Sequence, residues 1–469
     1  MNFEKLFIDG KWTDAHSSER IEVEDPATLQ MIAKVPAGNR QDVNAAVEAA
    51  SRAFENWNET SVSERILIVE RAKDILNERF EEILDLEVRE LGSPISWAKN
   101  AHVKGPIKRI EHFLKVMRSF PLEEELSKSR ILREPIGVVA AITPWNYPLG
   151  QIVQKIIPAM LTGNTVVLKP SQNTPLTSYI LCDAFARAGL PAGVLNLVTG
   201  RGAEVGNALA THPKVDMVSF TGSTDGGREV SKLALESIKK ISLELGGKSP
   251  LLVLRGADYE TAVRRAMDSV FYNTGQTCAA LTRMIVPRED LPQIEKLLIE
   301  GSSSYLVGDP KDEKIAVGPL SSRKQFDKVK KYMEIGISEG AKLIVGEIPK
   351  GPEGGYFVQP SVFTNVRNDM TIAKEEIFGP VLCLIPYTDE KEAIRIANDS
   401  IYGLSGAVFG PEDKAKKVAL LLRTGTVYIN EGRWDADAPF GGYKQSGIGR
   451  EGGLFGLEEF VEIKTVFDQ

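Results

Sequence analysis

Cysteine is scarce in this sequence: only Cys182, Cys278 and Cys383 occur among its 469 residues. They lie about a hundred residues apart and form no CxxC or other metal-ligand spacing, so no metal site is expected. So few cysteines are typical of a protein from a reducing compartment. We therefore expect a cytoplasmic location.

Long apolar runs and an excess of positive charge are also lacking. No segment approaches the ~18 apolar residues that a membrane span requires. Charged residues interrupt the first apolar stretch, so no signal peptide is expected. The formal net charge is −7, with acidic and basic residues interspersed. This argues against nucleic acid or an anionic membrane as a partner, since both need a basic face.

The chain is longer than the roughly 250 to 300 residues at which single cores stop growing, so two or three domains are expected. Apolar residues at three- and four-residue spacing predict helices over 40–117. From Ile136, short β-branched runs alternate with helical stretches, which indicates βαβ units and a parallel sheet. A second alternation of this kind begins near Pro250 and predicts a second α/β domain. Residues 125–134 and 461–467 alternate polar and apolar residues and predict strands of a small third layer, at an oligomer edge.

A glycine-rich segment is the first candidate for chemistry. Phe220 to Gly227 ends an apolar run and opens a helical stretch. Free backbone N–H groups there could hold a diphosphate at the positive end of a helix. The segment does not match the GxGxxG fingerprint. Taken alone, Gly222 and Gly227 fit an ordinary strand-to-helix turn equally well.

Cys278 and Glu244 form the second candidate. Cys278 follows a glycine-containing stretch with small neighbours, and Glu244 lies 34 residues upstream inside an apolar run. A lone cysteine is more often a buried small hydrophobe, and a lone acid is more often capped or paired. Together they fit a thiolate nucleophile and a general base for water.

Seven motifs, in this order along nearly the whole chain, resemble those of the aldehyde dehydrogenase superfamily, in its NAD(P)-dependent, non-acylating branch. The motifs are Pro144-Trp145-Asn146-Tyr147-Pro148, Lys169-Pro170-Ser171, Phe220-Thr221-Gly222-Ser223, Glu244-Leu245-Gly246-Gly247, Gly275-Gln276-Thr277-Cys278, Glu375-Glu376-Ile377-Phe378-Gly379-Pro380 and Pro439-Phe440-Gly441-Gly442. The resemblance implies an α/β fold in three parts. These are a Rossmann-like cofactor-binding domain (1–117 and 136–246), an α/β catalytic domain (247–438) and a small β oligomerisation layer (118–135 and 455–469).

The resemblance also implies a reaction, the oxidation of an aldehyde to a carboxylic acid. The Cys278 thiolate would attack the aldehyde carbon, and the Asn146 amide with the backbone N–H of Cys278 would stabilise the oxyanion. Loss of hydride to the nicotinamide leaves a thioester, and Glu244 would activate water to hydrolyse it. The apolar neighbours of Glu244 favour a raised pKa for its carboxyl.

The resemblance assigns Lys169 and Glu376 to the ribose hydroxyls and Ser223 to the diphosphate. Many NAD-preferring relatives carry glutamate three residues after this lysine, whereas this chain has Gln172. A neutral amide does not repel a 2′-phosphate, so we expect the use of both NAD and NADP. The full set expected to bind the cofactor is Trp145, Lys169, Ser171, Gln172, Gly222, Ser223, Gly227, Leu245, Glu376 and Phe378.

The expected substrate site includes aromatic residues at Tyr147, Tyr272, Trp434 and Phe440. Arg433 stands beside Trp434 in the charged loop 431–437. That loop fits a solvated surface turn or a site where Arg433 binds the remote anion of a substrate. The aldehyde would then be aromatic or carboxylate-bearing. A homodimer or homotetramer is expected.

Two other activities use the same residues. A cysteine hydrolase could cleave esters with Cys278 and Glu244 alone, but Lys169 and two strand-and-helix domains argue against it. A CoA-acylating dehydrogenase would pass the acyl group to a thiol. Those relatives generally lack the base, and Glu244 is present. A non-catalytic protein on this scaffold would be expected to lose the thiol.

Overall fold

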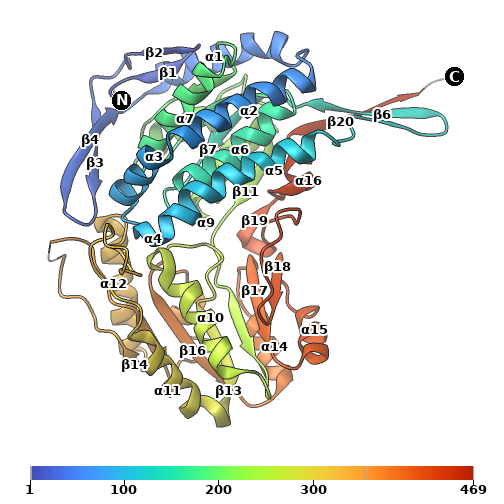
Figure 1. Cartoon of the computed structure of the whole chain (residues 1–469). Helices are drawn as coiled ribbons and strands as arrows, with labels where there is room; N and C mark the ends of the chain where they lie inside the picture. The colour runs from blue at the N-terminus through green and yellow to red at the C-terminus, as the bar shows by residue number, and fades with distance from the viewer. Residues whose placement is uncertain (1–2, 353, 468–469) are drawn as a thin grey trace.

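The computed structural model describes residues 3–352 and 354–467. It has two lobes, each built on one large sheet flanked by helices (Figure 1). The chain passes from the first sheet to the second after β11 and returns to the first at β19. In the described part of the chain, no helix is both long and apolar enough to cross a membrane.

The first lobe contains an eight-stranded sheet in the order β19-β11-β10-β7-β8-β9-β1-β2. Its five central strands run parallel, and the pairs at its edges are antiparallel. Most of these central strands are buried on both faces, as expected of a parallel sheet covered by helices. The strands are β1 Leu6–Ile8, β2 Lys11–Thr13, β7 Val138–Ile142, β8 Thr165–Lys169, β9 Leu195–Leu197, β10 Met217–Thr221, β11 Lys240–Glu244 and β19 Gly447–Ile448.

The first lobe has two hydrophobic cores, one on each face of its sheet, because side chains alternate between the two faces along each strand. Val139 packs with α2, α5, α6 and α7, whereas Val138 packs with α1, α8 and α9. Successive side chains of a strand point to opposite faces, so these two groups of helices cover opposite faces of the sheet. The helices are α1 Arg40–Trp57, α2 Val62–Glu78, α3 Phe80–Leu86, α4 Ile95–Ala98, α5 Gly105–Met117, α6 Pro148–Leu161, α7 Leu176–Arg187, α8 Asn207–Thr211 and α9 Thr224–Leu235.

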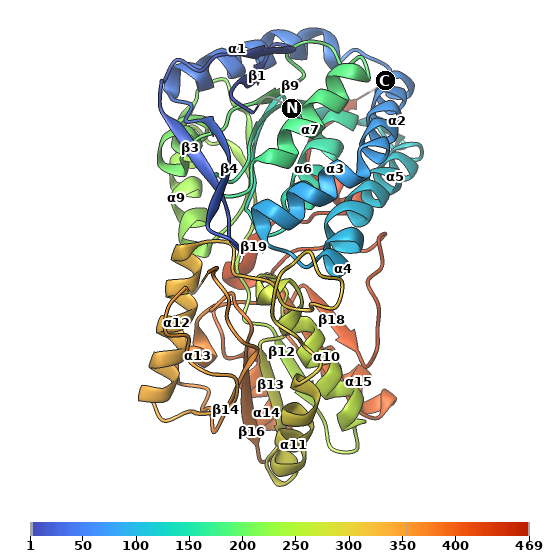
Figure 2. The same cartoon turned by 60° about the vertical axis from the view of Figure 1, so that its left-hand side comes forward.

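The second lobe contains a seven-stranded sheet in the order β14-β15-β16-β13-β12-β17-β18, parallel except at β14. Helices α10 and α11 cover one face and α12 to α15 the other (Figure 2). The strands are β12 Pro250–Val253, β13 Arg283–Pro287, β14 Lys342–Val345, β15 Ser361–Thr364, β16 Val381–Tyr387, β17 Ser405–Phe409 and β18 Thr426–Ile429. The helices are α10 Tyr259–Phe271, α11 Leu291–Ser302, α12 Arg323–Ser338, α13 Thr371–Lys374, α14 Glu390–Asn398 and α15 Glu412–Ala419.

A small antiparallel sheet joins β20 (Val461–Phe467), β6 (Ser129–Pro135) and β5 (Glu123–Glu125). Figure 1 shows β6 and β20 extending away from the two lobes. Helix α16 (Gly453–Glu458) leads into β20. The two polar and apolar alternations of the sequence are therefore strands that pair with each other. A separate hairpin, β3 (Arg20–Asp25) with β4 (Gln30–Pro36), was not expected.

Candidate active site

Four of the expected site residues stand at the carboxyl ends of neighbouring parallel strands. Lys169 ends β8 and Glu244 ends β11. Asn146 follows β7, and Ser223 follows β10. Parallel strands bring their carboxyl ends to one edge of the sheet, and ligands of open α/β sheets bind outside that edge. The fold therefore places these residues along one edge.

Cys278 follows a strained turn at the end of α10. Asn273, Thr274 and Gly275 all adopt left-handed backbone conformations, with φ of 53°, 55° and 70°. A β-branched residue rarely takes this conformation, so the turn stores strain that the surrounding packing must hold. Glycine is required at 275, since a Cβ there would lie 2.1 Å from the carbonyl oxygen of Gly379. The turn presents Cys278 as a half-buried free thiol.

Glu244 lies in the segment that packs against this turn. Gly247 makes the contact possible, because a Cβ there would come within 2.4 Å of the Cys278 carbonyl oxygen. The Glu244 side chain is 3% exposed, and its two carboxylate oxygens have no hydrogen-bond partner among the described residues. Burial raises the pKa of this carboxyl well above its usual range, and Glu451 raises it further.

The thiol and the carboxyl influence one another. Burial first, then the charges of Glu244 and Glu376, raise the pKa of the Cys278 thiol to about 12. Burial and the two carboxylate charges therefore disfavour the thiolate, which is the nucleophilic form of Cys278.

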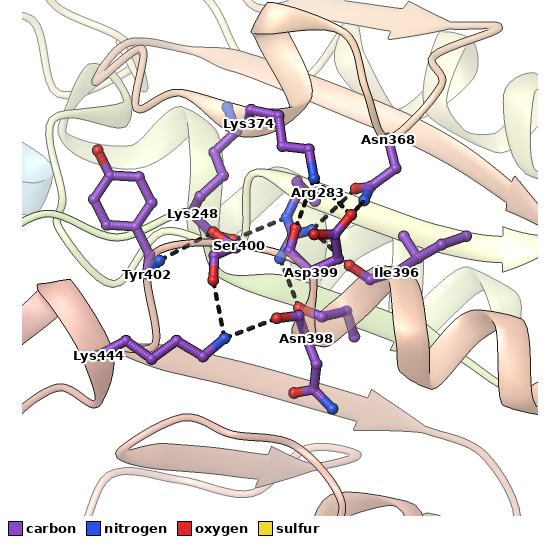
Figure 3. A network of polar contacts seen from close by, with 11 residues as sticks. Lys248, Arg283, Asn368, Lys374, Ile396, Asn398, Asp399, Ser400, Tyr402 and Lys444 are labelled. Atoms are coloured by element: carbon purple, nitrogen blue, oxygen red, sulfur yellow. Dashed lines mark hydrogen bonds and ion pairs between the residues drawn. The ribbon is translucent and has the colours of Figure 1, made fainter.

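A buried network fixes the backbone on both sides of Gly247. The Arg283 guanidinium, fully buried on β13, donates from Nε to the Lys248 carbonyl at 2.9 Å and caps two carbonyls at the C-terminus of α14 (Figure 3). A cation is favourable at that end of a helix. Before Gly247, Ser446 donates from Oγ to the Gly246 carbonyl at 2.7 Å. These bonds hold Gly247 against the turn at residues 273–275 and Cys278, which we call the thiol turn.

The Asn146 amide is fixed beside the thiol turn. Its Nδ2 donates to the Gln276 carbonyl at 3.0 Å, and its own backbone carbonyl accepts from Asn273 Nδ2 at 3.0 Å. An amide group has two N–H donors. One is engaged by Gln276, and the second has no hydrogen-bond partner among the described residues.

Behind Glu244 lies a buried ion pair that the sequence did not reveal. Lys155 of α6 contacts Glu451 at 2.6 Å, and its Nζ also donates to Ser219 Oγ at 3.2 Å. Glu451 lines the same cavity as Cys278. The charge of Lys155 lowers the pKa of Glu244, whereas that of Glu451 raises it. The two members of this ion pair therefore have opposite effects on the pKa of the Glu244 carboxyl.

A cavity of about 700 Å³ opens onto Cys278. The expected aromatic residues Tyr147, Tyr272, Trp434 and Phe440 all line it. Tyr272 stacks on Trp97 with ring centroids 4.9 Å apart, and Trp434 meets Phe440 edge-on at 5.8 Å. Tyr147 shares a 2.8 Å hydrogen bond with Thr277, next to the thiol.

Arg433, by contrast, is exposed and is not among the residues that line this cavity. Two other arginines line it, Arg109 of α5 and Arg265 of α10. The sequence analysis missed both. Each lies in an amphipathic helix with many charged residues, and the sequence does not show which of these faces the cavity.

The start of α9 suits a diphosphate. Ser223 caps this helix by accepting from the Gly226 N–H at 3.1 Å. Gly227 allows α9 to approach β11, because a side chain there would meet Leu245 at 2.5 Å. Gly222 sits between the strand and the helix, where a Cβ would lie 2.6 Å from the Phe220 ring. The N–H groups of this first turn can bind an anion.

Lys169 is buried and Glu376 is partly buried, and each forms only one hydrogen bond among the described residues. Lys169 Nζ donates to the Pro170 carbonyl at 3.0 Å, and burial lowers its pKa to about 8. An ammonium group has three donors, so two remain for hydroxyl groups. Glu376 accepts from the Gly247 N–H at 2.9 Å, and burial raises its pKa. These donors and acceptors fit a ribose.

The remaining expected cofactor residues lie around this site. Trp145 and Phe378 meet edge-on, with ring centroids 5.3 Å apart, and Phe378 has a φ of 62°. Ser171 accepts from the Asn173 N–H at 3.2 Å. Gln172 is exposed. The side chain at position 172 is therefore accessible to a ligand.

Comparisons with known proteins give one consistent result. Residues 12–466 match the aldehyde dehydrogenase family. The chain is 45% identical to 3-succinoylsemialdehyde-pyridine dehydrogenase of a Pseudomonas species, over 99% of this chain and 98% of that protein. It resembles the crystal structure of a mutant aldehyde dehydrogenase C from Pseudomonas syringae in complex with NAD+ and octanal. That match has a TM-score of 0.98 and 42% identity, over 99% of this chain and 97% of that one. An NAD+ complex of a Mycobacterium tuberculosis aldehyde dehydrogenase matches with a TM-score of 0.97 and 43% identity, over 100% and 99% of the two chains.

Proposed function

The chain belongs to the aldehyde dehydrogenase family, and we propose that Cys278, Asn146 and Glu244 carry out its oxidation of an aldehyde to a carboxylic acid. The family resemblance drawn from the seven motifs and the expected α/β fold class are thereby confirmed. The observation that carries this assignment of residues is the buried, unpartnered Glu244 carboxylate beside a thiol that opens onto a cavity.

The geometry supports a sequence of two half-reactions. The Cys278 thiolate adds to the aldehyde carbon to form a thiohemiacetal, and the amide of Asn146 donates to its oxyanion. NAD+, which the related structures bind, supplies the hydride acceptor when bound. Loss of hydride leaves a thioester on Cys278. Glu244 then takes a proton from water, whose oxygen attacks the thioester and releases the carboxylic acid and the thiolate.

The test of this function is a panel of aldehydes with NAD+, followed by the absorbance of the reduced nicotinamide. We expect turnover with water as the acyl acceptor, since a base is present. A requirement for CoA, with no turnover in its absence, would instead assign the chain to the acylating alternative. Ester cleavage without any aldehyde oxidation would support the hydrolase.

The first prediction concerns the oxyanion. Asn146→Ala is expected to lower kcat by ~10²-fold or more, because one of the proposed oxyanion donors is lost. The rate of Cys278 alkylation by iodoacetamide is the control, since a variant that changes only oxyanion binding leaves it unchanged. An unchanged kcat would show that Asn146 has only a structural role.

For the cofactor, we propose NAD with additional use of NADP. Gln172 is exposed and neutral three residues beyond Lys169. A carboxylate at this position would repel a 2′-phosphate at short range, whereas an amide can donate to it. NADP is therefore expected to be accepted as well as NAD.

The second prediction follows from this position. Gln172→Glu is expected to shift the preference toward NAD by ~1–3 kcal/mol, the size of one charged contact. The measurement is the ratio of kcat/KM for NADP and NAD. Gln41→Glu, an exposed change of the same charge on α1, is the control. If Gln172→Glu leaves the ratio unmoved, the backbone around the ribose sets the preference.

We also propose a homo-oligomer of two or four chains in the cytoplasm. Ile463 and Phe467 are exposed apolar residues on β20, in the sheet that extends from the body. An exposed strand edge with apolar side chains suits pairing with a second copy. The three free cysteines suit a reducing compartment.

A further inference from the structure

The cavity above Cys278 carries two cationic side chains that the proposed chemistry does not use. Arg109 projects from α5 and Arg265 from α10. Neither takes part in the attack of the thiol, the stabilisation of the oxyanion or the activation of water. Their presence in a cavity that must admit an aldehyde calls for a role in substrate binding.

Arg265 lies on α10, seven residues before Tyr272, and its guanidinium carries a positive charge. Helix α10 runs toward the thiol turn, and both Arg265 and Tyr272 line the cavity. Seven residues of helix separate them, which is about 10 Å of rise. Arg265 is therefore placed to meet a part of the substrate other than the carbonyl that lies at Cys278.

Arg109 is also free to bind. It is half-buried and makes no hydrogen bond or ion pair within the described ranges 3–352 and 354–467. Burial lowers its pKa, and Glu451 partly opposes this effect. Gly105 precedes Arg109 by one helical turn and also lines the cavity. The missing side chain at that turn leaves space beside the guanidinium.

Arg265 has an unsatisfied donor. Its Nε is buried without a hydrogen-bond partner in the described part of the chain, and its guanidinium lies over the Tyr428 ring at 5.2 Å. The aromatic face holds the guanidinium without using its N–H donors. In the described part of the chain, the other N–H groups of the Arg265 guanidinium also form no hydrogen bond or ion pair, so they are available to an anionic ligand in the cavity.

The acidic residues of the cavity do not neutralise these arginines. Asp268 accepts a hydrogen bond from Tyr305 at 2.6 Å, and Glu451 is paired with Lys155 at 2.6 Å. Neither forms a recorded ion pair with Arg109 or Arg265. The charge of Glu451 acts on Arg109 without forming an ion pair with it, so both guanidinium groups keep N–H donors for a ligand.

On these grounds we propose that Arg109 and Arg265 select aldehydes that carry a carboxylate at the end remote from the carbonyl. The inference rests on the proposed function and deepens it. It keeps the carboxylate-bearing substrate class that the sequence suggested and transfers the binding role from the exposed Arg433 to these two residues. Each guanidinium can donate two parallel hydrogen bonds to a carboxylate, which fixes the orientation of the substrate.

The experiment compares paired substrates. A homologous series of linear aldehydes with a terminal carboxylate is measured against n-alkanals of the same chain length, with saturating NAD+. We expect kcat/KM for the carboxylated member to exceed that for its alkanal partner at the length that reaches the arginines. Arg109→Met and Arg265→Met should each lower this ratio ~10- to 10²-fold, mainly through KM, as expected for the loss of a charged hydrogen bond.

Two matched variants control for charge. Lys108→Met and Arg264→Met each remove one positive charge from an exposed neighbour on the same two helices. They should leave the ratio unchanged, because their side chains do not line the cavity. Added salt should weaken the preference of the wild type less than expected for a surface site, since a buried pair is less screened.

The outcomes separate this inference from the proposed function. If alkanals are oxidised but the carboxylate gives no advantage, or if the ratio is the same in Arg109→Met and Arg265→Met as in the wild type, the anion site is wrong and the dehydrogenase stands. If no aldehyde of either kind is oxidised, the proposed function itself fails.

Discussion

Cys278→Ala is expected to abolish aldehyde oxidation, with a loss of at least ~10³-fold in kcat, because no other group can form the thioester. The remaining cysteines cannot substitute for it, since Cys182 and Cys383 are buried in the cores of the two lobes. The measurement is the formation of reduced nicotinamide, both in a single turnover and at steady state. Neither should be detectable above the blank.

The matching control is retention of the fold and of dinucleotide binding. Cys278 is half-buried, and its replacement by alanine removes one sulfur atom and leaves the strained turn at 273–275 intact. The thermal midpoint of unfolding should therefore change little, and NAD+ should still quench tryptophan fluorescence. Substantial residual turnover in a variant that binds NAD+ would remove Cys278 from the mechanism.

The general fold could be predicted from the sequence because its signals are local. Apolar periodicity over 40–117 marked the helices, and β-branched runs marked the central strands of both sheets. The hairpin of β3 and β4 was missed although Ile21 and Val23 alternate with charged residues there, a period-two signal in β3.

In the candidate site, too, features that depend on local sequence could be predicted, whereas contacts between residues distant in the sequence could not. Local motifs located Cys278, Glu244 and the glycines, and the aldehyde-oxidising activity that the motifs implied is confirmed by the family. The contact of Lys155 with Glu451 could not be predicted, since 296 residues separate them. Likewise, periodicity shows which residues share a helix face, but only the packing of α5 and α10 around the cavity shows that Arg109 and Arg265 line it.

The pKa of Glu244 depends both on its own segment and on residues distant in the sequence. Its own segment buries it at the end of β11, but Glu451 and Lys155 adjust its pKa from elsewhere in the chain. A carboxyl whose pKa is raised stays protonated at a pH where an ordinary glutamate is ionised. The basic form needed to activate water therefore increases as the pH rises through this raised pKa.

Glu244→Gln is expected to separate the two half-reactions. The glutamine keeps the shape of the side chain but cannot take a proton from water, so hydrolysis of the thioester should slow by ~10²- to 10⁴-fold. Formation of the thioester should persist, and rapid mixing with NAD+ and aldehyde should show a burst of reduced nicotinamide close to one per site. Slow steady turnover should follow, without the rise with pH that we expect of the wild type in this step. Glu458→Gln, at an exposed position of α16, is the control for loss of one carboxylate and should behave as the wild type. Mass spectrometry of the quenched variant should find the acyl group on Cys278. Absence of both burst and acyl adduct would mean that Glu244 acts before hydride loss, as the group that deprotonates the thiol, and the hydrolytic role proposed for it would then be wrong.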